Sequence, residues 1–419
     1  MTRHVPLLSL HLYEVIIDFC AEFEDNTTLL SCSLVCRSWV RRSRHHYFKT
    51  THIRSAGKAN SFLQLIHGSI TSINSLEIHA LVLGTNRGRV PQDWFCDWLP
   101  TLLRALPSVK ALSFSLANHE VHTALKVHPM PSGRAEGVFM APFSLVPDSL
   151  RMTTLKLAKC HFFSLRQLFF VLSQFTLLED LRLEGLQFKN TETDILIPNF
   201  GVYNCVQHLV YLKRLYVDTL ALESSRGDEV ASYFAFAMPS VEMLSLRMPK
   251  TKREWSIMQQ LLLGLRGSLM EVEWRECGDI RGDWSSLDLQ LRLLHVRAIC
   301  FSGIWRQPMD RFGLPPKSAV PLILYHICGA CELRGVLLDV EDPDFVTALN
   351  DSLCSAIDRG LARPAFSHLD QLVVRTDGQP QGITNLTVIL PQLWASWIAG
   401  RFPHTGSRGV MLKVEQTYR

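Results

Sequence analysis

The chain has 419 residues, of which 47% are hydrophobic and 20% charged, and its formal net charge is +4 at neutral pH. This composition excludes broad disorder and is typical of a globular protein with two or three domains. The small net charge gives no reason to expect a polyanionic partner. No apolar run reaches the length of a membrane span, and the eleven cysteines have no framework spacing. We therefore expect reduced thiols in a cytoplasmic or nuclear protein that does not contact membranes.

The first fifty residues predict two helical runs. The first has an apolar residue at every third or fourth position from Leu12 to Phe23, the period of a helix with one apolar face. The second, after an acidic turn, has two apolar stripes, one with Leu29, Cys32, Cys36 and Val40 and the other with Leu30, Leu34 and Trp39. About fifty residues cannot bury both stripes, so either the rest of the chain or another protein must cover one of them.

Residues 29–49, LLSCSLVCRSWVRRSRHHYFK, also raise a metal site and a nucleic-acid arm as alternatives. A zinc site needs four converging ligands, whereas the adjacent residues His45 and His46 point apart on a helix. From Arg37 to Lys58 there are seven Lys or Arg residues and no acid, but few aromatic residues are interleaved for base stacking. A helix with buried thiols and a solvated basic face is the favoured interpretation.

Residues 5–53 resemble an F-box, specifically the F-box-like type common in mushroom-forming fungi. Val35, Cys36, Arg37 and Trp39 match the family's Val-Cys-Arg-x-Trp signature, while Val5-Pro6-Leu7 replaces its usual Leu-Pro start. The resemblance implies a three-helix module that docks onto the Skp-type adaptor of a cullin–RING ubiquitin ligase. The adaptor-binding residues that it implies are Pro6, Leu7, Leu12, Ile16, Ile17, Leu29, Leu30, Leu34, Val35, Cys36 and Trp39.

A short phrase, apolar-x-x-apolar-x-apolar, recurs through the remaining chain from residue 73 onward, and its alternating tail predicts a short strand with one buried face. The copies are INSLEI, VKALSF, MTTLKL, LEDLRL, LKRLYV, VEMLSL, LMEVEW, LRLLHV, RGVLLDV, LDQLVV and GVMLKV. Helical runs lie between them, such as residues 253–267 and a run from an N-cap at Asp342 to Gly360. Alternating strands and helices that cannot bury their own faces predict a solenoid.

The phrase resembles the leucine-rich repeat, although the copies are 22 to 43 residues apart, which is less regular than that family. The expected fold class is therefore α/β, with a three-helix F-box module at residues 5–53 and an irregular leucine-rich-repeat-like solenoid at residues 60–419. The alternative is that the phrases are Leu-x-Leu strands that recur by chance in a different α/β domain.

Two Pro- and Gly-rich stretches, about residues 118–149 and 301–321, interrupt the array. Each is either a mobile loop or a recognition element held by the scaffold. In the second case Trp305 and Phe312 would be natural anchors for a target protein.

Catalytic and metal-binding motifs are missing from the sequence. It contains no Walker loop, GxGxxG, GxSxG or HExxH, and the lone CGAC at residues 328–331 has no second pair. We therefore expect no enzyme activity, metal or cofactor in this chain.

The function that these features indicate is a substrate receptor of an SCF-type ligase, which binds the adaptor through residues 5–53 and a target protein through the repeats. A scaffold protein that uses an F-box-like module outside a ligase is the alternative. A nucleic-acid or small-ligand binder that uses residues 41–58 is a third reading. Neither the target nor the binding face of the repeats can be identified from one sequence.

Overall fold

The fold is given by a computed structural model of the whole chain, and the ranges that the structure describes are as follows. They are residues 10–22, 26–68, 78–84, 94–115, 152–162, 168, 171–172, 175–188, 209–218, 238–249, 251–276, 291–304, 318–328, 332–341, 348–377 and 390–417. The chain divides into two compact units. The first comprises Met1–Leu178 with Leu186–Asn190 and Asp194–His208, and the second comprises Glu179–Gly185, Thr191–Thr193 and Leu209–Arg419.

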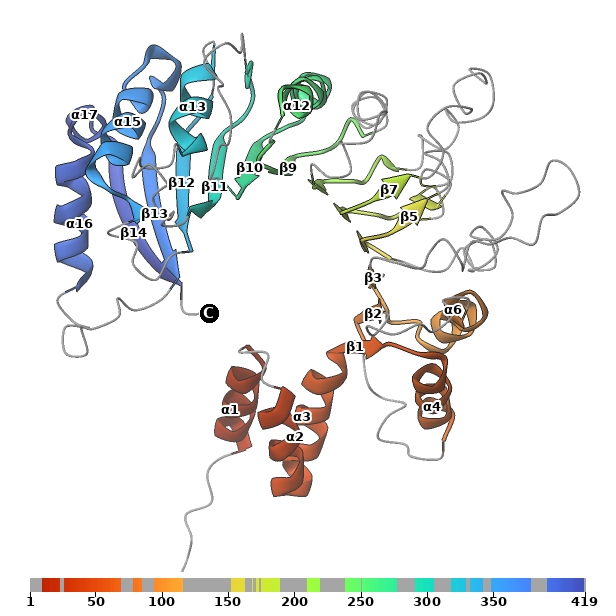
Figure 1. The fold of residues 1–419 in the computed structure, drawn as a ribbon. Coiled ribbons are helices and arrows are strands. Elements are labelled where there is room, and N and C mark those ends of the chain that lie inside the picture. Colours follow the sequence, from red (N-terminus) through yellow and green to blue (C-terminus); the bar gives the residue numbers. More distant parts are fainter. Residues whose placement is uncertain are drawn as a thin grey trace, which may run out of the picture. The chain divides into compact units, whose positions relative to one another are not determined.

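The first unit begins with three helices, α1 (Leu10–Glu22), α2 (Asn26–Val35) and α3 (Arg37–Lys49), which pack against one another (Figure 1). The expected single run from residue 29 to residue 49 is thus two helices. The break lies at Cys36, whose backbone is extended at φ −161° and ψ 167°. This break turns α3 back along α2, so that Trp39 packs against the core of the three helices.

A parallel sheet follows in the first unit, and α3 leads into its first strand without a linker. The strands β1 (Thr50–Ile53), β2 (Ala80–Gly84), β3 (Ala111–Ser115) and β4 (Thr154–Ala158) pair in chain order. The helices α4 (Ala56–His67) and α6 (Trp94–Ala105) pack together, and the short strands β5 (His161–Phe162) and β7 (Gln187–Phe188) pair with each other. Residues 50–53 therefore belong to the sheet, because they pair with β2, and not to the helical module predicted at residues 5–53.

The second unit also contains a parallel sheet whose strands pair in chain order, with more strands than the first. Its parallel sheet has the order β6 (Asp180–Glu184), β8 (Arg214–Val217), β9 (Met243–Arg247), β10 (Glu271–Arg275), β11 (Ala298–Ile304), β12 (Gly335–Val340), β13 (Gln371–Asp377) and β14 (Met411–Thr417). The connecting elements are α12 (Lys252–Leu265), α13 (Ala319–His326), α15 (Asp351–Leu361), η4 (Pro364–Phe366), α16 (Leu390–Arg401) and α17 (Pro403–Ser407). Helices α12, α13, α15 and α16 lie along one side of strands β9–β14 (Figure 1). Among the described residues no helix lies on the other side, which we call the open face.

The register of the strands aligns the buried residues of neighbouring repeats. Leu215, Leu244, Val272 and Ile299 stand side by side on successive strands, and each is at most 1% exposed. Equivalent residues therefore stack into apolar rows, as in a solenoid whose repeats bury their faces against their neighbours. The predicted solenoid of alternating strands and helices is thus present in the α/β architecture of both units.

Two of the described strands lie five residues after the phrase that predicted them, and residues 73–77 of the first phrase lie outside the described ranges. Strand β2 is formed by IHALVL and not by INSLEI, and β11 by VRAICF and not by LRLLHV. Leu294, which LRLLHV would bury in a strand, is 40% exposed in the turn before β11. With this correction Leu81 lies 31 residues before Leu112, and Ile299 lies 27 residues after Val272, so the repeat is more regular than the sequence indicated.

The residues at the two ends of helix α15 also differ from those predicted. The helix begins at Asp351, where the side chain of the N-cap residue Asn350 accepts a hydrogen bond from the backbone N–H of Leu353 at 2.9 Å. Residues 342–347, with the predicted cap Asp342, lie outside the described ranges. Gly360 lies inside the helix and does not end it. A Cβ at Gly360 would lie 3.1 Å from Leu324 Cβ, so this glycine allows α15 to approach α13 closely.

The second predicted insertion, residues 301–321, is shorter than expected at both ends. Strand β11 continues through Ile304, because Phe301 and Ile304 are buried, and α13 begins at Ala319 with Ser318 as its N-cap. The first predicted insertion, residues 118–149, lies outside the described ranges. Among the helices that the structure describes, none is both long and apolar enough to cross a membrane.

Candidate protein-interaction surfaces

The three N-terminal helices share a small core of their own. Ile17, Leu29 and Cys32 are buried at its centre, and Trp39 packs against them. The rings of Trp39 and Tyr13 are 5.3 Å apart between centroids. Because Ile17 and Leu29 are only 1% and 2% exposed, they hold the helices together and are not available to a partner, contrary to the prediction for these two residues.

Helices α1 and α2 also carry large apolar side chains that are exposed. We call these seven side chains the apolar face: Leu12, Val15, Ile16, Phe19, Leu30, Leu34 and Val35. Leu34 is 86% exposed, so its side chain contributes little to folding, and Phe19 is 59% exposed. Such a cluster on two packed helices marks an interaction surface.

The apolar face contains five of the predicted adaptor-binding residues, namely Leu12, Ile16, Leu30, Leu34 and Val35. Val15 and Phe19 were missing from that set, although their helical spacing relative to Leu12 already placed them on the same side of the first helix. Cys36 is exposed at the start of α3. Pro6 and Leu7 lie outside the described ranges.

A pair of charged contacts ties α1 to α3 beside this face. Arg42 Nε and Nη2 donate to the two carboxylate oxygens of Asp18, each at 2.7 Å, and His46 Nε2 lies 2.8 Å from Asp18 Oδ1. The hydrogen-bonded guanidinium of Arg42 lowers the pKa of Asp18 to about 2. This bidentate geometry fixes the direction of α1, and with it the positions of the exposed side chains on that helix.

Cys36 was expected to be a buried thiol and is not. Its Sγ lies 3.0 Å from Ser38 Oγ, and this hydrogen bond lowers the pKa of the thiol. Among the other described cysteines, Cys32, Cys160 and Cys354 are buried, and burial raises the pKa of Cys160 to about 12. The described residues contain no group of three or more His, Cys, Asp or Glu side chains that could hold a metal ion.

The open face of the second unit carries a connected polar network across four neighbouring strands. Ser245 Oγ donates to Glu273 Oε2 at 2.6 Å, and Ser302 Oγ donates to Glu273 Oε1 at 3.1 Å. Arg275 Nε donates to Ser245 Oγ at 3.0 Å, and the Arg275 guanidinium carbon lies 3.3 Å from the centroid of the Tyr216 ring. Burial lowers the pKa of Arg275 to about 10. The network fixes the side chains that this face presents.

Sequence reasoning did not identify these open-face residues individually. For Ser245, Glu273, Arg275 and Tyr216 the signal was available, since each occupies the position between two apolar residues of a predicted phrase or the position just after it, as Ser245 does in LSL and Glu273 does in VEW. Ser302 lies in β11, for which the predicted phrase was misplaced. Alternation places such residues on the face opposite the core. The predicted anchors Trp305 and Phe312 lie outside the described ranges.

Comparison with known proteins adds little to this geometry. No family model matches the chain. No curated protein matches it either. Among solved structures, the chain is similar to the leucine-rich repeat-containing protein LegL7 from Legionella pneumophila, with a TM-score of 0.39 and 13% identity, over 73% of this chain and 86% of the other.

Proposed function

We propose that this chain is the substrate receptor of an SCF-type cullin–RING ubiquitin ligase. In this proposal α1–α3 form an F-box that binds the Skp-type adaptor, and the repeats hold a target protein. The observation that supports the proposal most is the apolar face, whose side chains are exposed on helices that carry the Val-Cys-Arg-x-Trp signature at residues 35–39.

In α1–α3, the residues that hold the helices together differ from those that are exposed, and this separation supports the proposed role. Ile17, Leu29 and Trp39 provide an internal core, so a contact between the exposed residues and a partner would not require the helices to unfold. Burying exposed leucine and phenylalanine side chains against a partner yields roughly 25 cal/mol per Å² of apolar area before the costs of association.

The open face of the second unit is the proposed surface for the target protein. Its fixed serine, arginine and glutamate side chains offer donors and acceptors in a defined pattern, which favours specific recognition over general adhesion. Ubiquitin transfer would then need no catalytic residue in this chain, because tethering raises the local concentration of target lysines near the conjugating enzyme. Such a role would place the protein in the cytoplasm or nucleus.

The test is calorimetric titration of the purified full chain with a fungal Skp-type adaptor. We expect Leu34→Asp and Phe19→Asp each to weaken binding at least tenfold, because each places a charge in an apolar contact. Leu263→Asp is the matched control, since Leu263 is an exposed leucine on helix α12 of the second unit. This variant should bind the adaptor as tightly as the unmodified chain.

Two results would count against the proposal. Absence of adaptor binding by the unmodified chain would remove the F-box assignment altogether. Adaptor binding without recruitment of a cullin, measured by reconstitution with purified ligase subunits, would instead favour the non-ligase scaffold.

A further inference from the structure

Strand β14 lies at the end of the described sheet, and its apolar residues are incompletely covered. Among the described strands it pairs with β13 alone. Leu372 and Val374 on β13 are fully buried. Their neighbours on β14, Leu412 and Val414, are only half-buried. The apolar row of the second unit therefore reaches β14 and leaves part of its surface for a further occupant.

The backbone of β14 also has hydrogen-bonding groups that point away from β13. The N–H of Met411 donates to the carbonyl of Asp370, the residue before β13, at 2.9 Å. Because the direction of these groups alternates along a strand, those of Leu412 and Val414 point to the opposite side. An edge of this kind is a template for one more strand.

Two exposed charges of opposite sign limit which strand can pair at this edge. Lys413 and Glu415 lie, by alternation, on the face of β14 opposite its half-buried residues. The Glu415 carboxylate accepts a hydrogen bond from Arg375 Nη2 at 3.3 Å. A lysine on an edge strand discourages pairing, so an added strand must place an acidic residue opposite Lys413.

A second copy of β14 meets this requirement in an antiparallel register centred on Val414. Each Lys413 then lies opposite Glu415 of the second copy, so the opposite-charge pair occurs in both directions. Registers centred on Lys413 or on Glu415 would instead place two like charges opposite each other, which is destabilising. A register centred on Leu412 would place Lys413 opposite Met411. In the favoured register the outward N–H and C=O groups of the two Val414 residues also face each other.

We propose that two copies of this chain associate through β14, which pairs antiparallel with β14 of the second copy about a two-fold axis at Val414. The axis is perpendicular to the sheet, so the sheet continues from one copy into the other and the two Val414 side chains lie against each other on one face. A strand of seven residues is a small contact for a dimer, so we expect a dissociation constant of about 10–100 µM. The proposal concerns the second unit and does not depend on the F-box assignment.

Sedimentation velocity of the full chain between about 1 and 300 µM measures the association. We expect a monomer at the lowest concentration and a dimer, without larger species, at the highest, because a two-fold contact closes on itself. Hydrogen exchange at both concentrations locates the contact. Dimerisation should slow the exchange of amides in β14 and leave the exchange of those in β10 unchanged.

Two charge reversals test the register. Lys413→Glu places acidic residues opposite each other in the dimer, and Glu415→Lys places basic residues opposite each other, so each should weaken dimerisation at least about tenfold. An equimolar mixture of the two variants should dimerise at least as tightly as the unmodified chain, since each acidic residue then faces a basic one. Lys213→Glu makes the same charge change at an exposed position before β8, and this control should leave dimerisation unaltered.

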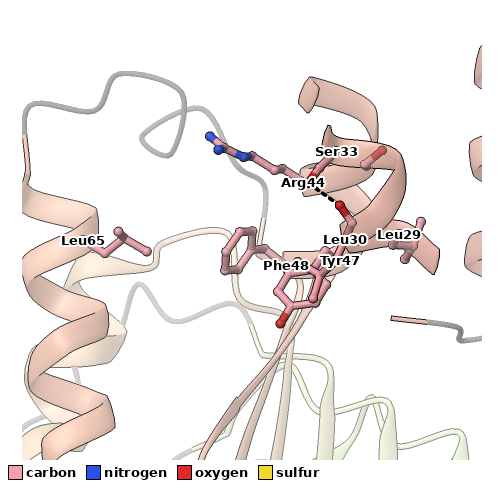
Figure 2. A pocket seen from close by; sticks show the side chains of 8 residues that line it. Leu29, Leu30, Ser33, Arg44, Tyr47, Phe48 and Leu65 are labelled. Atoms are coloured by element: carbon pink, nitrogen blue, oxygen red, sulfur yellow. Dashed lines mark hydrogen bonds between the residues drawn. The ribbon is translucent and has the colours of Figure 1, made fainter. Parts of the chain in front are cut away.

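The apolar face is a second surface at which copies of the chain can meet. Leu30 belongs to that face, and it also lines a pocket with Tyr47 and Phe48 of α3 (Figure 2). Leu30→Asp would break an association through this surface, and it should leave the β14 dimer intact.

The inference is overturned if the unmodified chain stays monomeric up to about 300 µM, or if it forms a dimer that neither charge reversal weakens. It is also overturned if Leu30→Asp abolishes the dimer, because the apolar face then holds the copies together. A mixture of the two reversed variants that stays monomeric would refute the antiparallel register.

Discussion

Asp358 is the clearest case of a single residue that joins two elements. Its side chain is 1% exposed and accepts hydrogen bonds from the backbone N–H of His404 at 3.0 Å, the backbone N–H of Thr405 at 2.8 Å and Thr405 Oγ1 at 2.6 Å. The carboxylate of α15 thereby satisfies the free donors at the start of α17. A buried carboxylate with three donors is satisfied, so it stabilises this corner of the second unit.

Asp358→Ala should lower the free energy of unfolding by about 2–4 kcal/mol, because the backbone N–H of His404 and the buried N–H and hydroxyl of Thr405 all lose their acceptor. Chemical denaturation of the full chain measures this loss. Asp370→Ala removes an exposed carboxylate 3.4 Å from Arg334 and should cost less than about 0.5 kcal/mol. Equal losses in the two variants would contradict the role assigned to Asp358.

Asp18 makes the stability of the helical module depend on pH. Its pKa is lowered to about 2 in the folded chain, mainly by the hydrogen-bonded Arg42, against an ordinary value near 3.9. The charged form therefore favours folding, and this contribution is present above pH 4 and lost as the pH falls from about 4 to 2. Because the Asp18 and Arg42 side chains are 36% and 42% exposed, we expect no more than about 1 kcal/mol.

Thermal unfolding between pH 5 and pH 2 measures this contribution. Asp18→Asn should show a shallower loss of stability over that range than the unmodified chain, with the two curves converging near pH 2. Parallel curves would mean that the contact with Arg42 does not contribute.

At the scale of elements, glycines distinguish close packing from helix termination. Gly360 and Gly400 both lie within helices, α15 and α16 respectively. A Cβ at Gly360 would meet Leu324 Cβ at 3.1 Å, whereas a Cβ at Gly400 would meet nothing within 4 Å. The two positions therefore form a matched pair that separates packing from helix propensity.

Gly360→Ala should lower the free energy of unfolding by roughly 1 kcal/mol, because the cost of pushing α15 away from α13 exceeds the gain in helix propensity. Gly400→Ala should be neutral or stabilise the chain by a few tenths of a kcal/mol. Urea denaturation of both variants checks the prediction, and a stabilising Gly360→Ala would show that Leu324 can move aside at little cost.

At the scale of the whole molecule, the strands form a one-dimensional array in which each repeat contacts its neighbours in the chain. Leu372 on β13 is fully buried between β12 and β14, whereas Leu412 on β14 is half-buried and pairs, among the described strands, with β13. In such an array the cost of a core truncation depends on the number of interfaces that it touches.

Leu372→Ala should therefore cost about 3–5 kcal/mol, and Leu412→Ala about 1–2 kcal/mol. Hydrogen exchange should also show that Leu412→Ala opens the amides of β14 without affecting those of β10. If Leu412→Ala exposes the inner strands to the same extent, the second unit unfolds as one cooperative body and not by fraying from β14.

Local patterns in the sequence were sufficient for the alternating strands and helices, the amphipathic first helix and the existence of an apolar stripe beyond what fifty residues can bury. They were sufficient because side-chain alternation and helical period depend only on neighbouring residues. The strand phrases around Leu244 and Val272 are examples, since both residues occupy the predicted core positions.

Only the tertiary structure decided which of several equivalent patterns was used. INSLEI and IHALVL carry the same phrase, and pairing with β1 and β3 selected the second. Ile16 and Ile17 are adjacent and equally apolar, and packing buried Ile17 but left Ile16 exposed. The physical reason is that burial and register depend on partners distant in the chain, which a local pattern does not specify.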